Sequence, residues 1–105
     1  MGLTIYWTAF SEKELQNIFS YYQEKVNIRV ATEIIEGIVN ETDILEKNPY
    51  IGQIEESLRD RTKEFRYLIH GNYKIIYWIN LDKNQIEIWD VFDCRQEPLK
   101  IKRTK

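Results

Sequence analysis

Two largely apolar stripes at helical spacing follow each other in the first half of the chain. In each stripe the side chains recur three and four positions apart, which places them along one side of a helix. The first stripe is Leu15, Ile18, Phe19, Tyr22 and Val26, and the second is Ala31, Ile34, Ile35, Ile38, Thr42 and Leu45. Because only a short break at Asn27 separates them, the two helices are predicted to form an antiparallel hairpin.

The ends of this hairpin carry their own signals. Ser11 and Glu14 match a capping box, so the first helix is predicted over residues 11–26. Asn48-Pro49 ends the second helix, because the residue before a proline is pushed out of the α region. Gly37 costs that helix up to about 1 kcal/mol relative to alanine, and a close approach of the first helix would explain it.

Short runs rich in β-branched and aromatic residues predict the strands. These runs are residues 4–9, 65–70, 73–80 and 86–92. Gly71-Asn72 supplies the positive φ of a two-residue hairpin turn, and residues 82–84 form the next turn. Residues 49–63 are predicted to be an irregular connection, and Pro98 to end regular structure.

The order β-α-α-β-β-β is typical of an α+β fold, here a two-helix hairpin packed on a mainly antiparallel sheet. The run 73–80 has apolar residues on both faces and is expected at the centre of the sheet. With 105 residues, the chain has the usual size of one domain, so a single domain over residues 1–105 is predicted.

Composition excludes several classes of function. No apolar run approaches the roughly 18 residues of a membrane span, and Cys94 has no partner for an internal disulfide. We therefore expect a cytoplasmic protein without a membrane partner. The glycines are scattered, and one histidine and one cysteine are too few for a zinc site. No metal, cofactor or small-molecule substrate is predicted.

Charge is distributed unevenly along the chain. Residues 1–58 hold four Lys and Arg against ten Asp and Glu, whereas residues 59–105 hold eleven against seven. Such a domain can present a basic surface to an anionic partner, although solvated carboxylates on the helices explain the pattern equally well.

Cations and aromatic residues gather on the three C-terminal strands. They are Arg66, Tyr67, Tyr73, Lys74, Tyr77, Trp78 and Arg95. Arginine and lysine bind phosphate oxygens, and aromatic rings stack on unpaired bases. Alternation would place Arg66 and Lys74 on the face opposite Phe65 and Tyr67, and we expect Arg95 to project with them. The alternative is that Tyr73, Tyr77 and Trp78 are packing residues.

Several segments, in this order, resemble one family. The segments are Trp7-Thr8, Asn48 to Gly52, Glu64-Phe65-Arg66, Gly71 to Tyr77 and Ile88 to Gln96. They resemble the RelE/ParE superfamily of toxins from type II toxin–antitoxin systems, also known from plasmid stabilisation, over nearly the whole chain. The resemblance implies the fold predicted above and a partner, the cognate antitoxin. It also implies one of two targets: ribosome-bound mRNA, which RelE-like members cut without a metal, or DNA gyrase, which ParE-like members inhibit.

The resemblance also implies site residues. Arg66, Lys74 and Arg95 fall at the family's basic positions and would be catalytic if the chain is a nuclease. Tyr67, His70, Tyr73 and Asp93 are the other candidate binding residues. Two positions depart from the pattern, because Asp93 stands where the family often has histidine and Gln96 where it has a second arginine.

These departures favour growth inhibition by protein binding, such as gyrase inhibition. RNA cleavage needs a base for the 2′-hydroxyl group, and only His70 or Asp93 offers one. The alternatives are a metal-independent mRNA endoribonuclease and an inactive homologue that acts as a binding module. The antitoxin is expected on the helical hairpin and the sheet edge, with the basic tail from Lys100 to Lys105 contributing.

Overall fold

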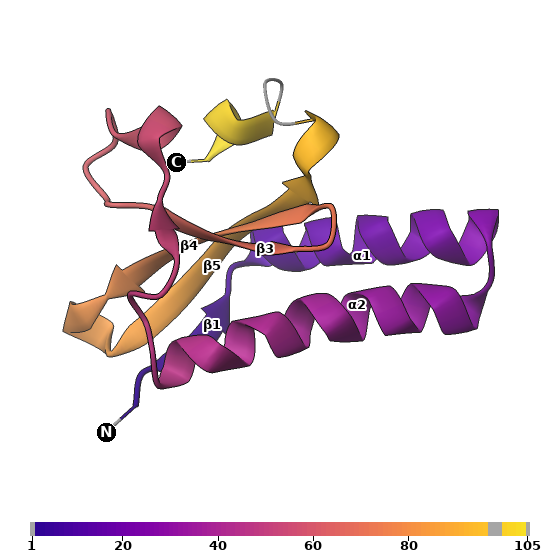
Figure 1. Cartoon of the computed structure of the whole chain (residues 1–105), viewed down its shortest axis with the longest axis horizontal. Coiled ribbons are helices and arrows are strands. Elements are labelled where there is room, and N and C mark those ends of the chain that lie inside the picture. The colour runs from indigo at the N-terminus through magenta and orange to yellow at the C-terminus, as the bar shows by residue number, and fades with distance from the viewer. Residues whose placement is uncertain (1, 97–99, 105) are drawn as a thin grey trace.

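A computed structural model describes residues 2–96 and 100–104 as two helices packed on one sheet (Figure 1). The helices are α1 (Ala9–Lys25) and α2 (Ile28–Thr42), and the strands are β1 (Thr4–Trp7), β2 (Gln53–Ile54), β3 (Arg66–His70), β4 (Tyr73–Asn80) and β5 (Gln85–Asp93). The sheet order is β1-β5-β4-β3-β2. The predicted α+β fold is confirmed, while Pro98 and Lys105 lie outside the described residues.

Helix α1 begins earlier than the capping-box pattern predicted. Thr8, not Ser11, is the N-cap, and its hydroxyl accepts a hydrogen bond from the Ser11 backbone N–H. Ser11 is instead the third residue of the helix and fully buried, because its hydroxyl donates back to the Thr8 carbonyl. The break at Asn27 is confirmed, since its side chain caps α2 through the Val30 N–H.

Gly37 of α2 faces the sheet rather than helix α1. A Cβ atom added to Gly37 would lie 2.6 Å from Nε2 of His70, the last residue of β3. The expectation that α1 approaches this glycine was therefore wrong. The missing side chain makes room for an imidazole ring.

The antiparallel hairpin β3–β4 sets the register of the sheet. Gly71 has the expected positive φ of 58°, so His70 pairs with Tyr73 and Arg66 with Tyr77. Strand β4 lies inside the sheet as predicted, between β3 and β5. Strand β1 pairs with β5 in parallel. The segment predicted to be irregular contains β2, a two-residue edge strand paired with β3.

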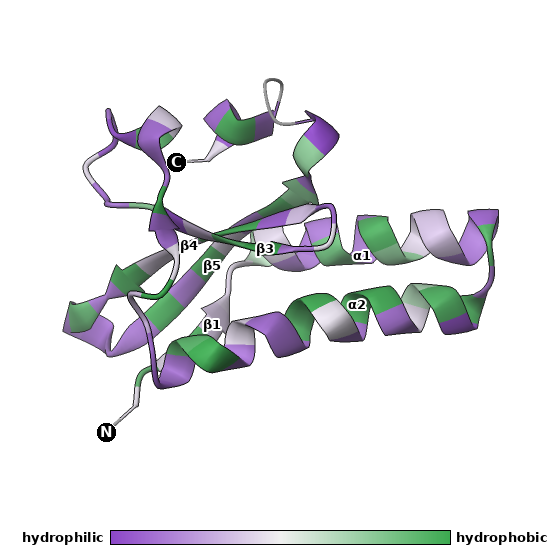
Figure 2. Cartoon of the chain, in the orientation of Figure 1, coloured by the Kyte–Doolittle hydropathy of each residue, from purple (hydrophilic) through white to green (hydrophobic). Residues whose placement is uncertain are grey.

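Each face of the sheet has its own apolar cluster. Ile75, Tyr77 and Val91 pack against the helices, and we call this side the helix face. Ile76, Phe92 and Phe65 pack on the other side, the outer face, beneath Leu58 and Ile101. Figure 1 shows the C-terminal segment across the sheet from the helices, and Figure 2 shows hydrophobic residues on β4 and β5 as well as on both helices.

The basic tail is docked on the protein itself. Arg103 binds the fully buried Asp90 through Nε and Nη2, at 2.7 and 2.8 Å, and contacts Glu14 of α1 at 2.9 Å. Lys102 donates to the Ser57 carbonyl, and Arg61 donates to the carbonyls of Lys102 and Thr104. Arg103 therefore fastens the C-terminal segment to the domain, and both Lys102 and Arg103 of the expected antitoxin contact already have partners within the chain.

Candidate functional site

Arg66 and Lys74 project from opposite faces of the sheet. Arg66 pairs with Tyr77, and directly opposed residues of an antiparallel pair point to the same side, which here is the helix face. Lys74 lies on the outer face, where its Nζ is 4.2 Å from the centre of the Tyr67 ring. The expectation of one shared face, opposite Tyr67, was wrong.

Lys74 is part of a buried ion pair. Its Nζ lies 2.7 Å from Oε1 of Glu55, and the two side chains are only 8% and 6% exposed. Burial pushes the pKa of Glu55 upward, but hydrogen bonds from Lys74 and Ser57 outweigh this and hold the pKa below its ordinary value. Lys74 therefore fastens the segment after β2 to the outer face.

Arg66 braces the loop that precedes β2. Its Nη1 donates to the Gly52 carbonyl at 2.9 Å, and its guanidinium lies 5.0 Å from the centre of the Tyr50 ring. The Tyr77 hydroxyl binds the same loop: it accepts a hydrogen bond from the Gly52 N–H and donates one to the Pro49 carbonyl. A weaker contact joins Arg66 to Glu64 at 3.4 Å.

His70 lies at the helix face, between β3 and α2. Its Nδ1 is 2.9 Å from Oε1 of Glu41, and its ring fills the space beside Gly37. This position joins the hairpin turn to α2. In the sheet, His70 is paired with Tyr73, which is paired on its other side with Asp93 at the end of β5.

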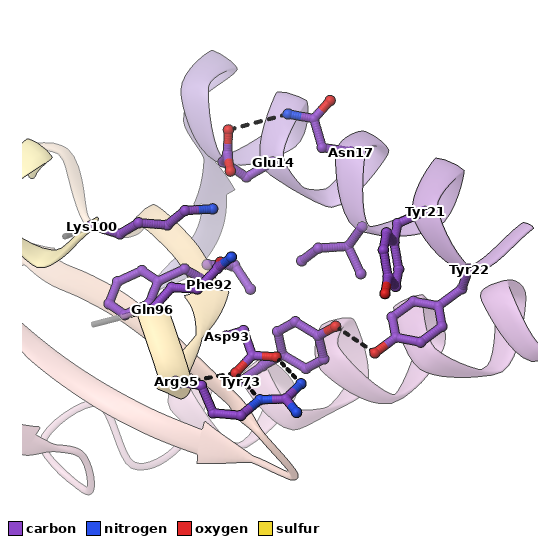
Figure 3. Close-up of a pocket in the computed structure, with 12 residues that line it drawn as sticks. Glu14, Asn17, Tyr21, Tyr22, Tyr73, Phe92, Asp93, Arg95, Gln96 and Lys100 are labelled. Atoms are coloured by element: carbon purple, nitrogen blue, oxygen red, sulfur yellow. Dashed lines mark hydrogen bonds and ion pairs between the residues drawn. The ribbon is translucent and has the colours of Figure 1, made fainter. Parts of the chain in front are cut away.

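Tyr73, Asp93 and Arg95 are brought together in one cleft of about 440 Å³ (Figure 3). The cleft lies between α1 and the ends of β4 and β5. Its other lining residues are Glu14, Asn17, Ile18, Tyr21, Tyr22, Val91, Phe92, Gln96 and Lys100. Three other predicted site residues, Arg66, Tyr67 and Lys74, line a second and more open hollow of about 490 Å³ at the β2 edge of the sheet, together with Glu55 and Glu56.

The polar groups of the cleft are paired with one another. Arg95 donates from Nε to Oδ1 of Asp93 at 2.9 Å, which lowers the pKa of Asp93. Burial, together with the hydrogen bond to the Tyr22 hydroxyl, raises the pKa of Tyr73. The Tyr73 hydroxyl thus stays protonated at neutral pH, and the Asp93 carboxylate is engaged by Arg95.

The cleft combines an exposed cation with aromatic rings. The Arg95 side chain is 74% exposed even though it binds Asp93, and Tyr21 on the opposite wall is 57% exposed. Arginine and tyrosine are enriched at the centres of protein interfaces. The arrangement suits a protein segment that presents apolar and acidic side chains.

No group of three His, Cys, Asp or Glu side chains suited to a metal ion occurs among residues 2–96 and 100–104. Neither helix in this part of the chain has the length and hydropathy that a bilayer crossing requires.

Comparison with known families decides what the chain is. The family model described as the ParE toxin of type II toxin–antitoxin systems, parDE, matches residues 5–98. This chain belongs to the ParE toxin family. The resemblance to RelE/ParE toxins and its ParE-like branch are confirmed, and the protein is the toxin of a type II toxin–antitoxin system.

Solved structures share the fold of this ParE-family toxin. The chromosomal ParDE system from P. aeruginosa matches with a TM-score of 0.71 and 15% identity, covering 87% of this chain and 95% of that one. The toxin–antitoxin complex RelBE2 from Mycobacterium tuberculosis gives 0.55 and 17%, covering 89% and 92%. A mutant of E. coli toxin RelE in the free state gives 0.54 and 16%, covering 99% and 94%. Among curated proteins, none matches the sequence.

Several residues that shape the site of this toxin were not predicted. Tyr22 and Glu14 were interpreted as a core residue and a capping residue, but both line the cleft. Glu55 lies in the segment that was predicted to be an irregular connection, and it is buried against Lys74. For Lys74 the signal was available, because a two-residue turn at Gly71-Asn72 places odd-numbered residues of one strand opposite even-numbered residues of the other.

Proposed function

We propose that this toxin inhibits growth by binding a protein target, with DNA gyrase as the expected target, rather than by cutting RNA. The observation that carries the proposal is that Arg66 and Lys74 project from opposite faces of the sheet and that both are already engaged within the chain. A nuclease must stabilise the dianionic phosphorane with converging cations. Here Lys74 forms an ion pair with Glu55, and Arg66 donates a hydrogen bond to the loop before β2.

The cleft supplies the surface for a protein partner. Arg95 and Tyr21 flank it from two walls, and Lys100 reaches in from the C-terminal segment (Figure 3). We propose that a cognate antitoxin neutralises the toxin, as the partners in the solved ParDE and RelBE2 systems suggest. An acidic, amphipathic segment that folds on binding fits the cleft best.

Two assays run in parallel test the target. The purified chain is added to a gyrase supercoiling reaction and to a cell-free translation reaction in which the mRNA is followed on a gel. We expect supercoiling to be inhibited while the mRNA stays intact. Cleaved mRNA would overturn the proposal in favour of the endoribonuclease, and inactivity in both assays would favour the inactive homologue.

A further inference from the structure

Two tryptophans stand side by side on the outer face, away from the cleft. Trp78 belongs to β4 and Trp89 to β5, and both pack against the outer-face cluster while remaining partly exposed. Strict alternation would not bring them together. The register between β4 and β5 slips after Ile76, so that Trp89 is the extra residue of a β-bulge. Bulges commonly re-aim a side chain next to a functional site.

A lysine of the chain occupies the space between the two rings. The ammonium of Lys63 lies 5.2 Å from the ring centre of Trp78 and 5.2 Å from that of Trp89. Tryptophan faces attract cations within about 6 Å, more strongly than other aromatic rings do. Phe65 packs edge-on against Trp89, with 5.6 Å between ring centres, and helps to fix the ring in place.

A buried carboxylate completes the surroundings. Glu87 is paired with Trp78 across the strands and is only 8% exposed. It accepts hydrogen bonds from the Trp89 indole N–H at 3.1 Å and from the Asn80 amide at 2.9 Å. The Glu87 carboxylate therefore lies beside the Trp89 ring and across the strands from Trp78.

We propose that Trp78, Trp89 and Glu87 form an ammonium-binding cage that accepts a lysine side chain of a partner protein in place of Lys63. Lys63 shows that the cage fits a primary ammonium at the end of an alkyl chain. It sits on the connecting segment between Leu58 and β3, outside the helices and strands. This site is separate from the cleft and goes beyond the proposed function.

The test uses the full chain with N-acetyl-lysine-N-methylamide as the probe and N-acetyl-norleucine-N-methylamide as its uncharged control. Indole N–H signals of Trp78, Trp89 and Trp7 are followed by NMR in wild type, Lys63→Ala and a matched surface variant, Lys47→Ala. In Lys63→Ala we expect saturable shifts at Trp78 and Trp89 but not at Trp7. The probe concentration that gives half-saturation in Lys63→Ala should be at least fivefold lower than in wild type or Lys47→Ala.

Three results would overturn the cage. They are no saturable shift in Lys63→Ala, an equal effect of the norleucine compound, and equal half-saturation in wild type and Lys63→Ala. If Lys63→Ala does not fold, Lys63→Gln replaces it. In wild type, the protons beside the Lys63 ammonium should also show upfield ring-current shifts that Trp78→Leu reduces, and their absence would equally contradict the proposal.

Discussion

Lys74 and Glu55 form an ion pair with 2.7 Å between Nζ and Oε1, closed off from water beneath the Tyr67 ring. The family resemblance associates the position of Lys74 with phosphate binding. Because Lys74 is paired with Glu55, it has a structural role here instead. Buried charges of this kind depend on each other, because removing one leaves the other without compensation in an apolar setting.

The Lys74→Ala variant is therefore expected to be less stable than wild type, and the substitution is not expected to remove a catalytic group. The uncompensated Glu55 should lower the free energy of unfolding by roughly 3–5 kcal/mol. The double variant Lys74→Met with Glu55→Leu should lose much less, because no charge is left buried. Urea unfolding followed by fluorescence measures both. Equal losses in the single and the double variant would contradict the role of the pair.

The pH dependence of stability should reflect Glu55. Its pKa is lowered in the folded protein, so the unfolded state binds the proton more readily as the solution is acidified. This contribution to stability is complete above the unfolded pKa, near the ordinary value of 4.5, and is lost as the pH falls through the folded pKa. Unfolding free energies of wild type and Glu55→Gln measured from pH 7 to pH 3 should converge at the acidic end.

Gly37 and His70 are expected to be energetically coupled. In a helix, alanine is favoured over glycine by about 1 kcal/mol, but a Cβ at position 37 would meet the His70 ring at 2.6 Å. Gly37→Ala should thus stabilise the protein in a His70→Ala background and lose that benefit when His70 is present. A double-mutant cycle from thermal or urea unfolding gives the coupling, and additive effects would show that the ring moves aside without cost.

Arg103 is expected to hold the C-terminal segment through Asp90. Burial raises the pKa of Asp90 even though the Arg103 hydrogen bonds oppose it. Arg103→Met should lower the free energy of unfolding by roughly 3 kcal/mol at pH 7, because a buried carboxylate is left unpaired. That loss should shrink in acid, where Asp90 takes up a proton. Lys102→Ala is the control and should change stability little, since its single contact to Ser57 is exposed.

Arg95→Ala is expected to reduce toxicity without affecting the fold. Arg95 is largely exposed, and its contact with Asp93 is a surface pair of small energetic value. Growth after induction without the antitoxin measures toxicity, and circular dichroism checks the fold. Arg59→Ala is a matched control, because Arg59 is also exposed and paired, with Glu56, but lies outside the cleft. Equal toxicity of the Arg95 and Arg59 variants would remove the cleft from the proposed mechanism.

The helices and the central strands could be predicted because their signals are local. Apolar spacing indicates α1 and α2, and Gly71 indicates the β3–β4 turn with its positive φ. The two-residue strand β2 could not be found this way, because its partner β3 comes later in the chain and determines it. Thr8 was missed as the cap because Ser11 and Glu14 match the same pattern three residues further on.

Predicting the site required contacts between distant segments. The cleft joins α1 to the end of β5, and the neutralisation of Lys74 depends on where residue 55 settles on the sheet. Charge and residue type suggested a common basic surface, but the hairpin register distributes these cations between two sides of the sheet. The two-residue length of the Gly71-Asn72 turn was the sequence signal that predicts this distribution of Arg66 and Lys74.

The parallel pairing of β1 with β5 has a consequence for synthesis in the cell. Thr4 is synthesised long before Gln85, its neighbour in the sheet. Contacts so distant in sequence form late in folding. Ile5 and Trp7 of a nascent chain therefore stay unpaired until β5 has been synthesised. Fragments that end before β5 are expected to be unfolded and not toxic. Growth inhibition is then expected only from chains that include β5.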